Sequence, residues 1–343
     1  MKILIDIVHP ADALFFLHPI RLWQRAGHTV WVASRHKDVT LDLLDALAVG
    51  HKCISTAGGN LFSLGLELVR RDFALLVMAR QFKPDVMCGF GGVAISHVGK
   101  LLGIPSVSFY DTERAPLQHK LTLPFISRLY VPDSYDGPIA TNRTSRFAGT
   151  KDLSFFHPEN FMPDLNCALR AGLVQETPNY FIRLVGWQAN HDIGLTGWSV
   201  ETLQRFVEYL AQRGAVHISS ELPLPQALEA HRYRGPVNEV HHLLAHCQCY
   251  IGESATMAGE AVLLGVPAIY ATQDRRSYTD ELARQGLLWT LTEVDFDSLR
   301  RVLAEVETLD STELSRRLGS YLQGTVNLAE YVADAVIREA GSQ

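Results

Sequence analysis

Short apolar runs rich in β-branched residues alternate with longer amphipathic segments through the first half of the chain. The run 2–8 predicts a strand, His9 and Pro10 lie in the loop after it, and the apolar spacing predicts a helix from about 14 to 24. The same unit recurs, with a helix expected near 64–80 and strands near 27–34, 84–89, 104–110 and 129–132. Because these strands are nearly continuously apolar, we expect a parallel, doubly wound α/β sheet with both faces covered.

This alternation stops at residues 153–178, which are rich in Pro, Asn, Asp and Phe and predict a linker. A second α/β series follows, with helices near 199–213, 238–246, 256–265 and 277–286 and strands near 180–185, 216–219, 249–252 and 268–271. A final helix is expected over about 327–340. We therefore expect an N-terminal domain of residues 1–160, a C-terminal domain of residues 161–324, and a segment 325–343 whose helix packs back on the N-terminal domain.

The composition supports two domains and excludes some partners. A chain of 343 residues with 47% hydrophobic residues can fill two cores of ordinary size. The formal net charge of −6 provides no basic field for a polyanion, so nucleic acid is not an expected partner. Asp6 interrupts the first apolar run too early for a signal peptide, and the expected location is the cytoplasm. Five cysteines in mostly apolar surroundings predict reduced thiols and no disulfide.

The segment 249–265 carries a candidate phosphate-binding site. A strand ends at Gly252, small residues follow, and a helix then runs through Glu260. Small residues at a helix start let backbone N–H groups approach a phosphate, and Glu260, one to two turns inside, could accept both hydroxyls of a ribose. The alternative is an ordinary strand-to-helix turn with Ser254 or Thr256 as the N-cap and a solvated Glu260.

This segment resembles the nucleotide-sugar signature of GT-B glycosyltransferases, especially the peptidoglycan N-acetylglucosaminyltransferase that makes lipid II. The likeness lies in the helix 253–260, the turn 265–268 and the loop 273–274. It implies that Glu260 binds the ribose, that residues 254–257 face the pyrophosphate, and that Gln273 reaches the sugar hydroxyls. The N-terminal half is similar to the acceptor domain of the same enzymes through the segments 84–92, 102–105 and 109–113, which implies that Gly91 and Gly92 lie on the acceptor side.

The whole chain also resembles an uncharacterised family of GT-B-like proteins, through motifs at 9–10, 111–113, 187–192, 219–221 and 252–257. The resemblance implies two doubly wound Rossmann-like domains that face each other across a cleft. The residues expected at the nucleotide-sugar site are Arg183, Trp187, Ser220, Glu221, Glu253, Ser254, Ala255, Thr256, Met257, Glu260, Gln273 and Asp274. The lipid II enzyme has a glycine-rich first loop where this chain has 6–10, and a Gly-Gly-Ser-Gln sequence where it has 186–191, so a different acceptor is implied.

His9, Asp111, Glu113 and His191 lie beyond the ends of predicted strands and are candidate catalytic groups. Arg183 is a further candidate within a predicted strand. His9 could take a proton from an acceptor hydroxyl, and Asp111 and Glu113 could supply a carboxylate base or orient His9. The alternatives are a His9 ring that caps the following helix, and carboxylates that serve as turn and N-cap residues. His191 or Arg183 could neutralise charge on a departing diphosphate, although an edge or interdomain salt bridge is the alternative for Arg183.

A run of metal-type ligands is interpreted as structural. Helical spacing places Val240, Leu243, Leu244 and Cys247 in the core, points His241 and His242 outward, and leaves Cys249 to the next strand. No metal and no other cofactor is expected.

The leading hypothesis is a glycosyltransferase that moves a sugar from a nucleotide diphosphate sugar, UDP-linked, to a glycan or lipid-linked acceptor. A non-hydrolysing nucleotide-sugar 2-epimerase shares the fold and is the alternative, although this chain has Ala261 where those enzymes have a second carboxylate. A non-catalytic nucleotide-sugar-binding protein is the third hypothesis. The apolar segment 61–78 is consistent with peripheral contact at the inner face of a membrane, which a lipid-linked acceptor would favour.

Overall fold

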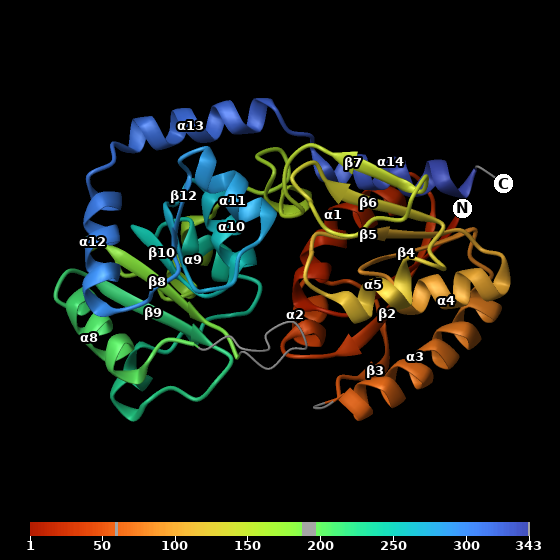
Figure 1. Ribbon diagram of the computed structural model, residues 1–343, viewed down its shortest axis with the longest axis horizontal. Helices are drawn as coiled ribbons and strands as arrows, with labels where there is room; N and C mark the ends of the chain where they lie inside the picture. The colour runs from red at the N-terminus through yellow and green to blue at the C-terminus, as the bar shows by residue number, and fades with distance from the viewer. Residues whose placement is uncertain (59–60, 187–196, 342–343) are drawn as a thin grey trace. The chain divides into compact units, whose positions relative to one another are not determined.

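The computed structural model describes residues 1–58, 61–186 and 197–341, apart from the side chains of residues 61 and 62. The chain forms two compact units (Figure 1). The first combines Met1–Asn160 with the chain from Thr325 onward, and the second is Phe161–Gly324. Each unit is built on one parallel β-sheet, as the alternating sequence pattern predicts.

The first unit contains a seven-stranded sheet with the order β3-β2-β1-β4-β5-β6-β7. The strand order reverses between β1 and β4, which is where ligands bind in open α/β sheets, beyond the carboxyl ends of the strands. Four apolar residues of β1 are completely buried, because helices cover both faces of the sheet. The strands are β1 (Lys2–Ile7), β2 (Thr29–His36), β3 (Lys52–Thr56), β4 (Val86–Phe90), β5 (Ser106–Phe109), β6 (Arg128–Pro132) and β7 (Thr144–Phe147).

Three helices of this unit lie near the positions that the sequence predicts, at 10–25, 61–82 and 328–340. Four helices, at 40–46, 93–102, 116–122 and 153–156, were not predicted. Two edge strands, β3 and β7, were not predicted either, because their mixed polar and apolar residues carry a weak strand pattern. The helices are α1 (Pro10–Arg25), α2 (Thr40–Ala46), α3 (Leu61–Phe82), α4 (Val93–Leu102), α5 (Pro116–Thr122), α6 (Leu153–Phe156) and α14 (Leu328–Ala340).

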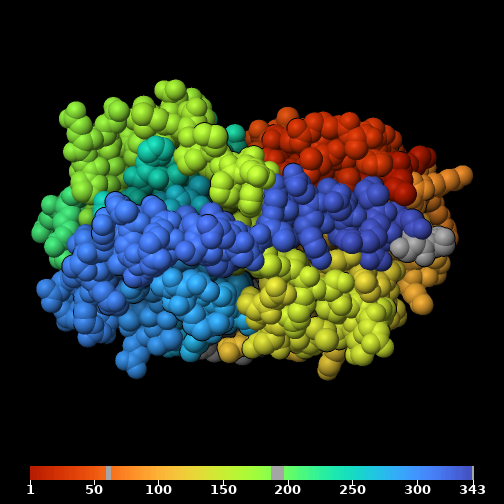
Figure 2. Space-filling model, turned by 90° about the horizontal axis from the view of Figure 1, so that it is seen from above, coloured from red at the N-terminus to blue at the C-terminus, as the bar shows by residue number. Residues whose placement is uncertain are grey.

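Helix α14, at the end of the chain, completes the first unit. Figure 2 shows it, in blue, between the red N-terminal elements and the yellow segment that contains β6 and β7. The indole Nε1 of Trp23 donates a hydrogen bond of 3.1 Å to the carbonyl of Ala333, and the hydroxyl of Tyr130 donates one of 2.9 Å to Glu339. Leu328 and Val332 of α14 are completely buried. The first unit therefore draws its core from both ends of the chain.

The second unit contains a five-stranded sheet with the order β12-β11-β10-β8-β9. The strands predicted near 180–185, 216–219, 249–252 and 268–271 are all present. The strands are β8 (Asn179–Leu184), β9 (Ala215–Ser220), β10 (Cys249–Gly252), β11 (Ala268–Ala271) and β12 (Leu288–Leu291). The helices are α7 (Leu165–Arg170), α8 (Val200–Ala211), α9 (Val240–Leu244), α10 (Ala255–Leu263), α11 (Ser277–Arg284), α12 (Phe296–Glu307) and α13 (Ser311–Gln323), with a 3-10 turn, η1 (Gln226–His231).

The predicted linker, 153–178, contains the junction of the two units after Asn160, but it also contains two helices and is not an irregular connection. Residues 153–156 form the buried helix α6, and the hydroxyl of Ser154 donates a hydrogen bond of 2.5 Å to the carbonyl of Phe15. Helix α7 follows, capped by Asp164. The segment is too rich in Pro, Asn and Asp to show a helical period, but Phe155 and Phe156 supply the buried apolar surface that holds α6 on the first unit.

Three of the five cysteines are buried, and all five are free thiols. None of the helices, over the residues that were described, is both long enough and apolar enough to cross a membrane.

Candidate functional site

The start of α10 is built from small residues because the backbone is crowded there. Gly252 ends β10 against the backbone of Arg183, where a Cβ atom would collide. Ser254 then caps α10, its hydroxyl accepting a hydrogen bond of 3.2 Å from the backbone N–H of Met257. This capping role was one of the two interpretations of the sequence. Residues 254–257 are half-buried, so the first amides of the helix lie near the surface, where an anion could reach them.

Glu260 and His241 form a buried pair behind this helix start. The imidazole Nε2 of His241, on α9, donates a hydrogen bond of 3.0 Å to Oε2 of Glu260. The alternative of a solvated Glu260 is wrong, because its side chain is buried. The expectation that His241 points outward is also wrong. Helical spacing missed His241 because α9 is only five residues long and its burial is set by α10.

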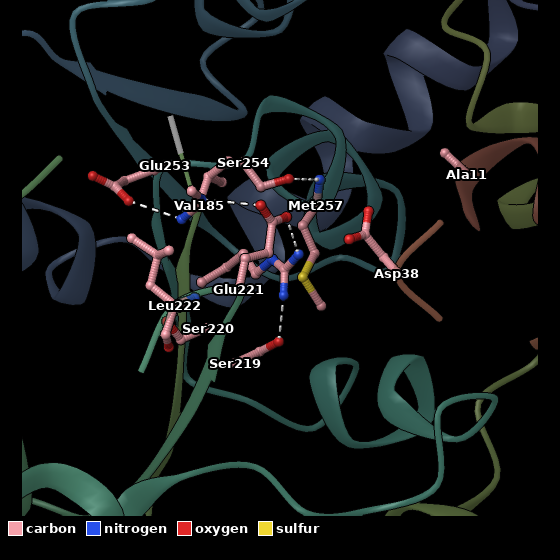
Figure 3. A network of polar contacts seen from close by, with 12 residues as sticks. Ala11, Asp38, Val185, Ser219, Ser220, Glu221, Leu222, Glu253, Ser254 and Met257 are labelled. Carbon is pink, nitrogen blue, oxygen red and sulfur yellow. Dashed lines mark hydrogen bonds and ion pairs between the residues drawn. The ribbon is translucent and has the colours of Figure 1, made fainter. Parts of the chain in front are cut away.

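Glu253 and Glu221 hold the two ends of the loop that follows β8. Oε2 of Glu253 accepts a hydrogen bond of 2.9 Å from the N–H of Val185, and Oε1 accepts one of 3.0 Å from Trp198. Oε2 of Glu221 accepts a hydrogen bond of 3.0 Å from Gly186. Figure 3 shows these carboxylates beside the start of α10. Both were predicted to bind nucleotide sugar, and in the structure both bind the backbone of the chain.

Arg183 and Ser220 also have partners within the second unit. The guanidinium of Arg183 donates to the hydroxyl of Ser219 at 2.7 Å and to Oε1 of Glu221 at 2.5 Å. Ser220 donates to the carbonyl of Leu222 at 2.8 Å, closing a local turn. Of the alternatives for Arg183, the structure shows a salt bridge within the second unit, to Glu221. Its charge lies next to the loop after β8, partly balanced by Glu221.

Two further predicted residues lie in the described structure and two lie outside it. Asp274 is buried and accepts hydrogen bonds from Arg276 at 2.6 Å and from the Tyr270 hydroxyl at 3.2 Å. This anchors the loop on which Gln273 is exposed. Trp187 and His191 are outside the described residues.

His9 caps helix α1 in the first unit. Its Nδ1 accepts a hydrogen bond of 3.2 Å from the N–H of Ala11, and Asp12 in turn accepts one of 3.0 Å from the N–H of His9. With Nδ1 as acceptor, a neutral ring carries its proton on Nε2, which is then a hydrogen-bond donor. Burial raises the pKa of Asp12 to about 7, although the hydrogen bonds that its carboxylate accepts from the Val8 and His9 amides partly offset this effect.

Asp111 lies in a buried charge cluster that also contains Lys151 and Asp152. The ammonium of Lys151 lies 2.8 Å from Oδ2 of Asp111 and 3.9 Å from Oδ1 of Asp152, above the ring of Phe90. Lys151 and Asp152 were missed from the sequence. The available signal was a pair of charged residues in the loop after β7, at the carboxyl edge of the sheet.

Glu113 is half-buried on the same loop as Asp111, and His119 bonds the carbonyl of Thr112 at 3.1 Å. Gly91 and Gly92 have φ values of 74° and 56°, which only glycine adopts without strain, and they lead into α4 beneath the side chain of Gln118. These residues therefore form a rigid, polar edge on the first sheet. In the portion of the chain that is described, no three His, Cys, Asp or Glu side chains are grouped as metal ligands would be.

The two parallel sheets and their helices define the GT-B fold, with two Rossmann-like units. The chain belongs to the family described as "Protein of unknown function (DUF354)", whose model matches residues 1–179. A search of curated proteins found no match.

Solved structures of UDP-GlcNAc 2-epimerases and of a glycosyltransferase share the fold. The UDP-GlcNAc 2-epimerase from Neisseria meningitidis, bound to UDP-GlcNAc, is 12% identical with a TM-score of 0.68, covering 98% of this chain and 100% of its own. The UDP-GlcNAc 2-epimerase from Methanocaldococcus jannaschii is 15% identical with a TM-score of 0.64, covering 91% and 94%. The calicheamicin glycosyltransferase CalG4 is 14% identical with a TM-score of 0.60, covering 99% and 98%. What this chain shares with these proteins is the fold.

Proposed function

We propose that this protein is a glycosyltransferase that moves a sugar from a UDP-linked donor to a glycan or lipid-linked acceptor. The observation that carries the proposal is the start of α10, where small residues and a capping serine precede a buried carboxylate on the same helix. Structures with this fold include one bound to UDP-GlcNAc. The acceptor would be bound by the N-terminal unit.

The second unit supplies the donor contacts in this proposal. The first amides of α10 and the positive end of its dipole face the pyrophosphate, and charge that develops on the departing diphosphate is stabilised there without a metal. Because Oε2 of Glu260 is bound to His241, Oε1 is the oxygen that accepts the ribose hydroxyl. Gln273, exposed on its anchored loop, reaches the sugar.

Transfer needs a base for the acceptor hydroxyl. The acceptor oxygen attacks the anomeric carbon, the bond from that carbon to the diphosphate oxygen breaks, and the base takes the hydroxyl proton. Asp111 is the preferred candidate because it is a buried carboxylate beyond the carboxyl end of β5, held 2.8 Å from the ammonium of Lys151, and Glu113 on the same loop is the second. His9 is better suited to donate a hydrogen bond, since its Nδ1 caps α1.

A nucleotide-sugar 2-epimerase is the second candidate function. The structural similarity to two such epimerases and the buried Asp111–Lys151 pair favour it, because inversion at C2 needs groups that remove and return a proton. This chain has Ala261 where the epimerases have a second carboxylate, which favours glycosyl transfer over epimerisation. A binding protein without activity is the third hypothesis, and product formation by pure protein would exclude it.

Radiolabelled UDP-N-acetylglucosamine and a panel of other nucleotide sugars, incubated with pure protein, distinguish these functions. Free UDP that appears only when membrane extract is added supports transfer, whereas a C2 epimer formed without extract supports epimerisation. No turnover of any donor, with or without extract, would contradict both. A calorimetric comparison of Glu260→Ala with Glu208→Ala, an exposed glutamate on α8, tests the donor site. We expect about tenfold or greater loss of UDP affinity in Glu260→Ala alone, since a hydrogen bond to a charged group is worth roughly 1.5–3 kcal/mol.

A further inference from the structure

Helix α3 lies on the outside of the first unit (Figure 1). It exposes an apolar stripe that no described element of this unit covers. Four large side chains three or four residues apart are exposed: Leu66 by 44%, Val69 by 66%, Phe73 by 68% and Val77 by 48%. This spacing places them on one side of the helix. The opposite side of α3 carries Leu75, Met78 and Ala79 into the core. The stripe is therefore a second apolar face, in addition to the one that folding requires.

The charges on this exposed face are positive. Arg70 and Arg80 are exposed, and their helical positions place them among the four apolar residues. None of the exposed side chains described on α3 is a carboxylate. The two acidic residues of the helix are turned aside into ion pairs, Glu67 with Arg35 at 2.8 Å and Asp72 with His97 at 2.7 Å.

The neighbouring helix α4 extends the same character. His97, on α4, ties the two helices together through Asp72, and this hydrogen bond raises the pKa of His97. Lys100 and Leu101, at the end of α4, are both exposed. A basic and apolar surface thus stands out on a chain whose formal net charge is −6.

We propose that the exposed face of α3 is a docking surface for an anionic lipid bilayer. Valine, leucine and phenylalanine side chains would enter the boundary between headgroups and acyl chains, while Arg70 and Arg80 contact the lipid phosphates. The positive charge is what selects this partner, because a second copy of the chain would bring the same arginines against each other. The binding does not depend on the transfer reaction proposed above, and it is measured without nucleotide sugar.

Sedimentation with vesicles tests this surface. We expect the full-length protein to sediment with phosphatidylglycerol–phosphatidylcholine vesicles and to remain in solution with pure phosphatidylcholine. The double variant Val69→Ser/Phe73→Ser should bind at least about tenfold more weakly, because it loses the side chains that insert. Arg70→Gln/Arg80→Gln should lose about fivefold for each arginine removed. Met162→Ser/Leu165→Ser, which changes exposed apolar residues of the second unit, should bind as the wild type does.

Thermal unfolding and sedimentation velocity accompany each variant, so that misfolding and self-association are recognised. Failure of the folded wild-type protein to bind anionic vesicles would overturn the proposal. Equal binding by the wild type and by a folded Val69→Ser/Phe73→Ser variant would overturn it as well. A wild-type dimer that becomes a monomer in that variant, without vesicle binding by either, would assign the face to a second copy instead.

Discussion

The imidazole Nε2 of His241 lies 3.0 Å from Oε2 of Glu260, and both side chains are buried. The bond joins α9 to the helix that begins at the proposed pyrophosphate site. It fixes the rotamer of Glu260 and keeps a proton donor against one oxygen, so the other oxygen has a defined direction. In the proposed function His241 is a positioning residue, because it acts on the ligand through Glu260.

Substitution of His241 should separate positioning from folding. We expect His241→Ala to weaken UDP binding about fivefold to tenfold, since Glu260 loses the partner that orients it. His241→Gln, whose amide N–H can replace Nε2, should restore much of the affinity. Calorimetric titration with UDP measures this, with thermal unfolding as the check on folding. Equal affinity in the wild type and in folded His241→Ala would contradict the positioning role.

The pH dependence of stability should report Asp12. Burial raises its pKa from 3.8 to about 7 in the folded state, so folding favours the protonated carboxyl. The contribution of this raised pKa to the free energy of unfolding is fully present below about pH 4 and is lost as the pH rises through about 7. Asp12→Asn keeps an oxygen for the Val8 and His9 amides and carries no charge.

We therefore expect Asp12→Asn to gain stability relative to the wild type between pH 5 and pH 8, by roughly 2–3 kcal/mol. Denaturant unfolding of both proteins at the two pH values measures the difference. Glu330→Gln, at an exposed carboxylate on α14, is the control and should show no such trend. A difference between Asp12→Asn and wild type that is independent of pH would show that Asp12 is ionised throughout.

Removal of the Lys151 charge should destabilise the first unit. Lys151→Met leaves the buried carboxylates of Asp111 and Asp152 without their ammonium, which costs roughly 3–5 kcal/mol. The double variant Lys151→Met/Asp111→Asn should recover part of this loss. A double-mutant cycle by denaturant unfolding measures the coupling. Additive effects of the two substitutions would contradict a direct Lys151–Asp111 interaction.

The first unit should need the packing of α14 for its stability. Val332 is completely buried, so Val332→Ser should lower the free energy of unfolding by roughly 2–4 kcal/mol, through lost apolar contact and a buried hydroxyl. Glu330→Ser on the exposed side of the same helix is the matched control and should have little effect. Hydrogen exchange localises the change: we expect faster exchange in α1 and β1, with the second unit unaffected.

Much of the architecture follows from local sequence pattern. Strands such as β1 and β10 are short and almost wholly apolar, and the helices between them show clear periods, so burial on both faces can be read directly. Ser254 as a helix cap is also a local matter, because its partner is three residues away. Segments with weak patterns were missed, and α6 was mistaken for part of a linker because two phenylalanines do not make a period.

The partners of the buried carboxylates cannot be predicted from local sequence pattern. Residue type and position predict that Glu253 and Asp111 lie beyond strand ends and that Glu260 lies inside a helix, but not what each carboxylate binds. Glu253 bonds a backbone amide 68 residues away, and Lys151 lies 40 residues from Asp111. A buried carboxylate must find donors wherever the packed elements bring them, because leaving it unsatisfied is costly. The periodicity of the chain determines its strands and helices, and the packing of those elements decides which carboxylates hold the fold and which face a ligand.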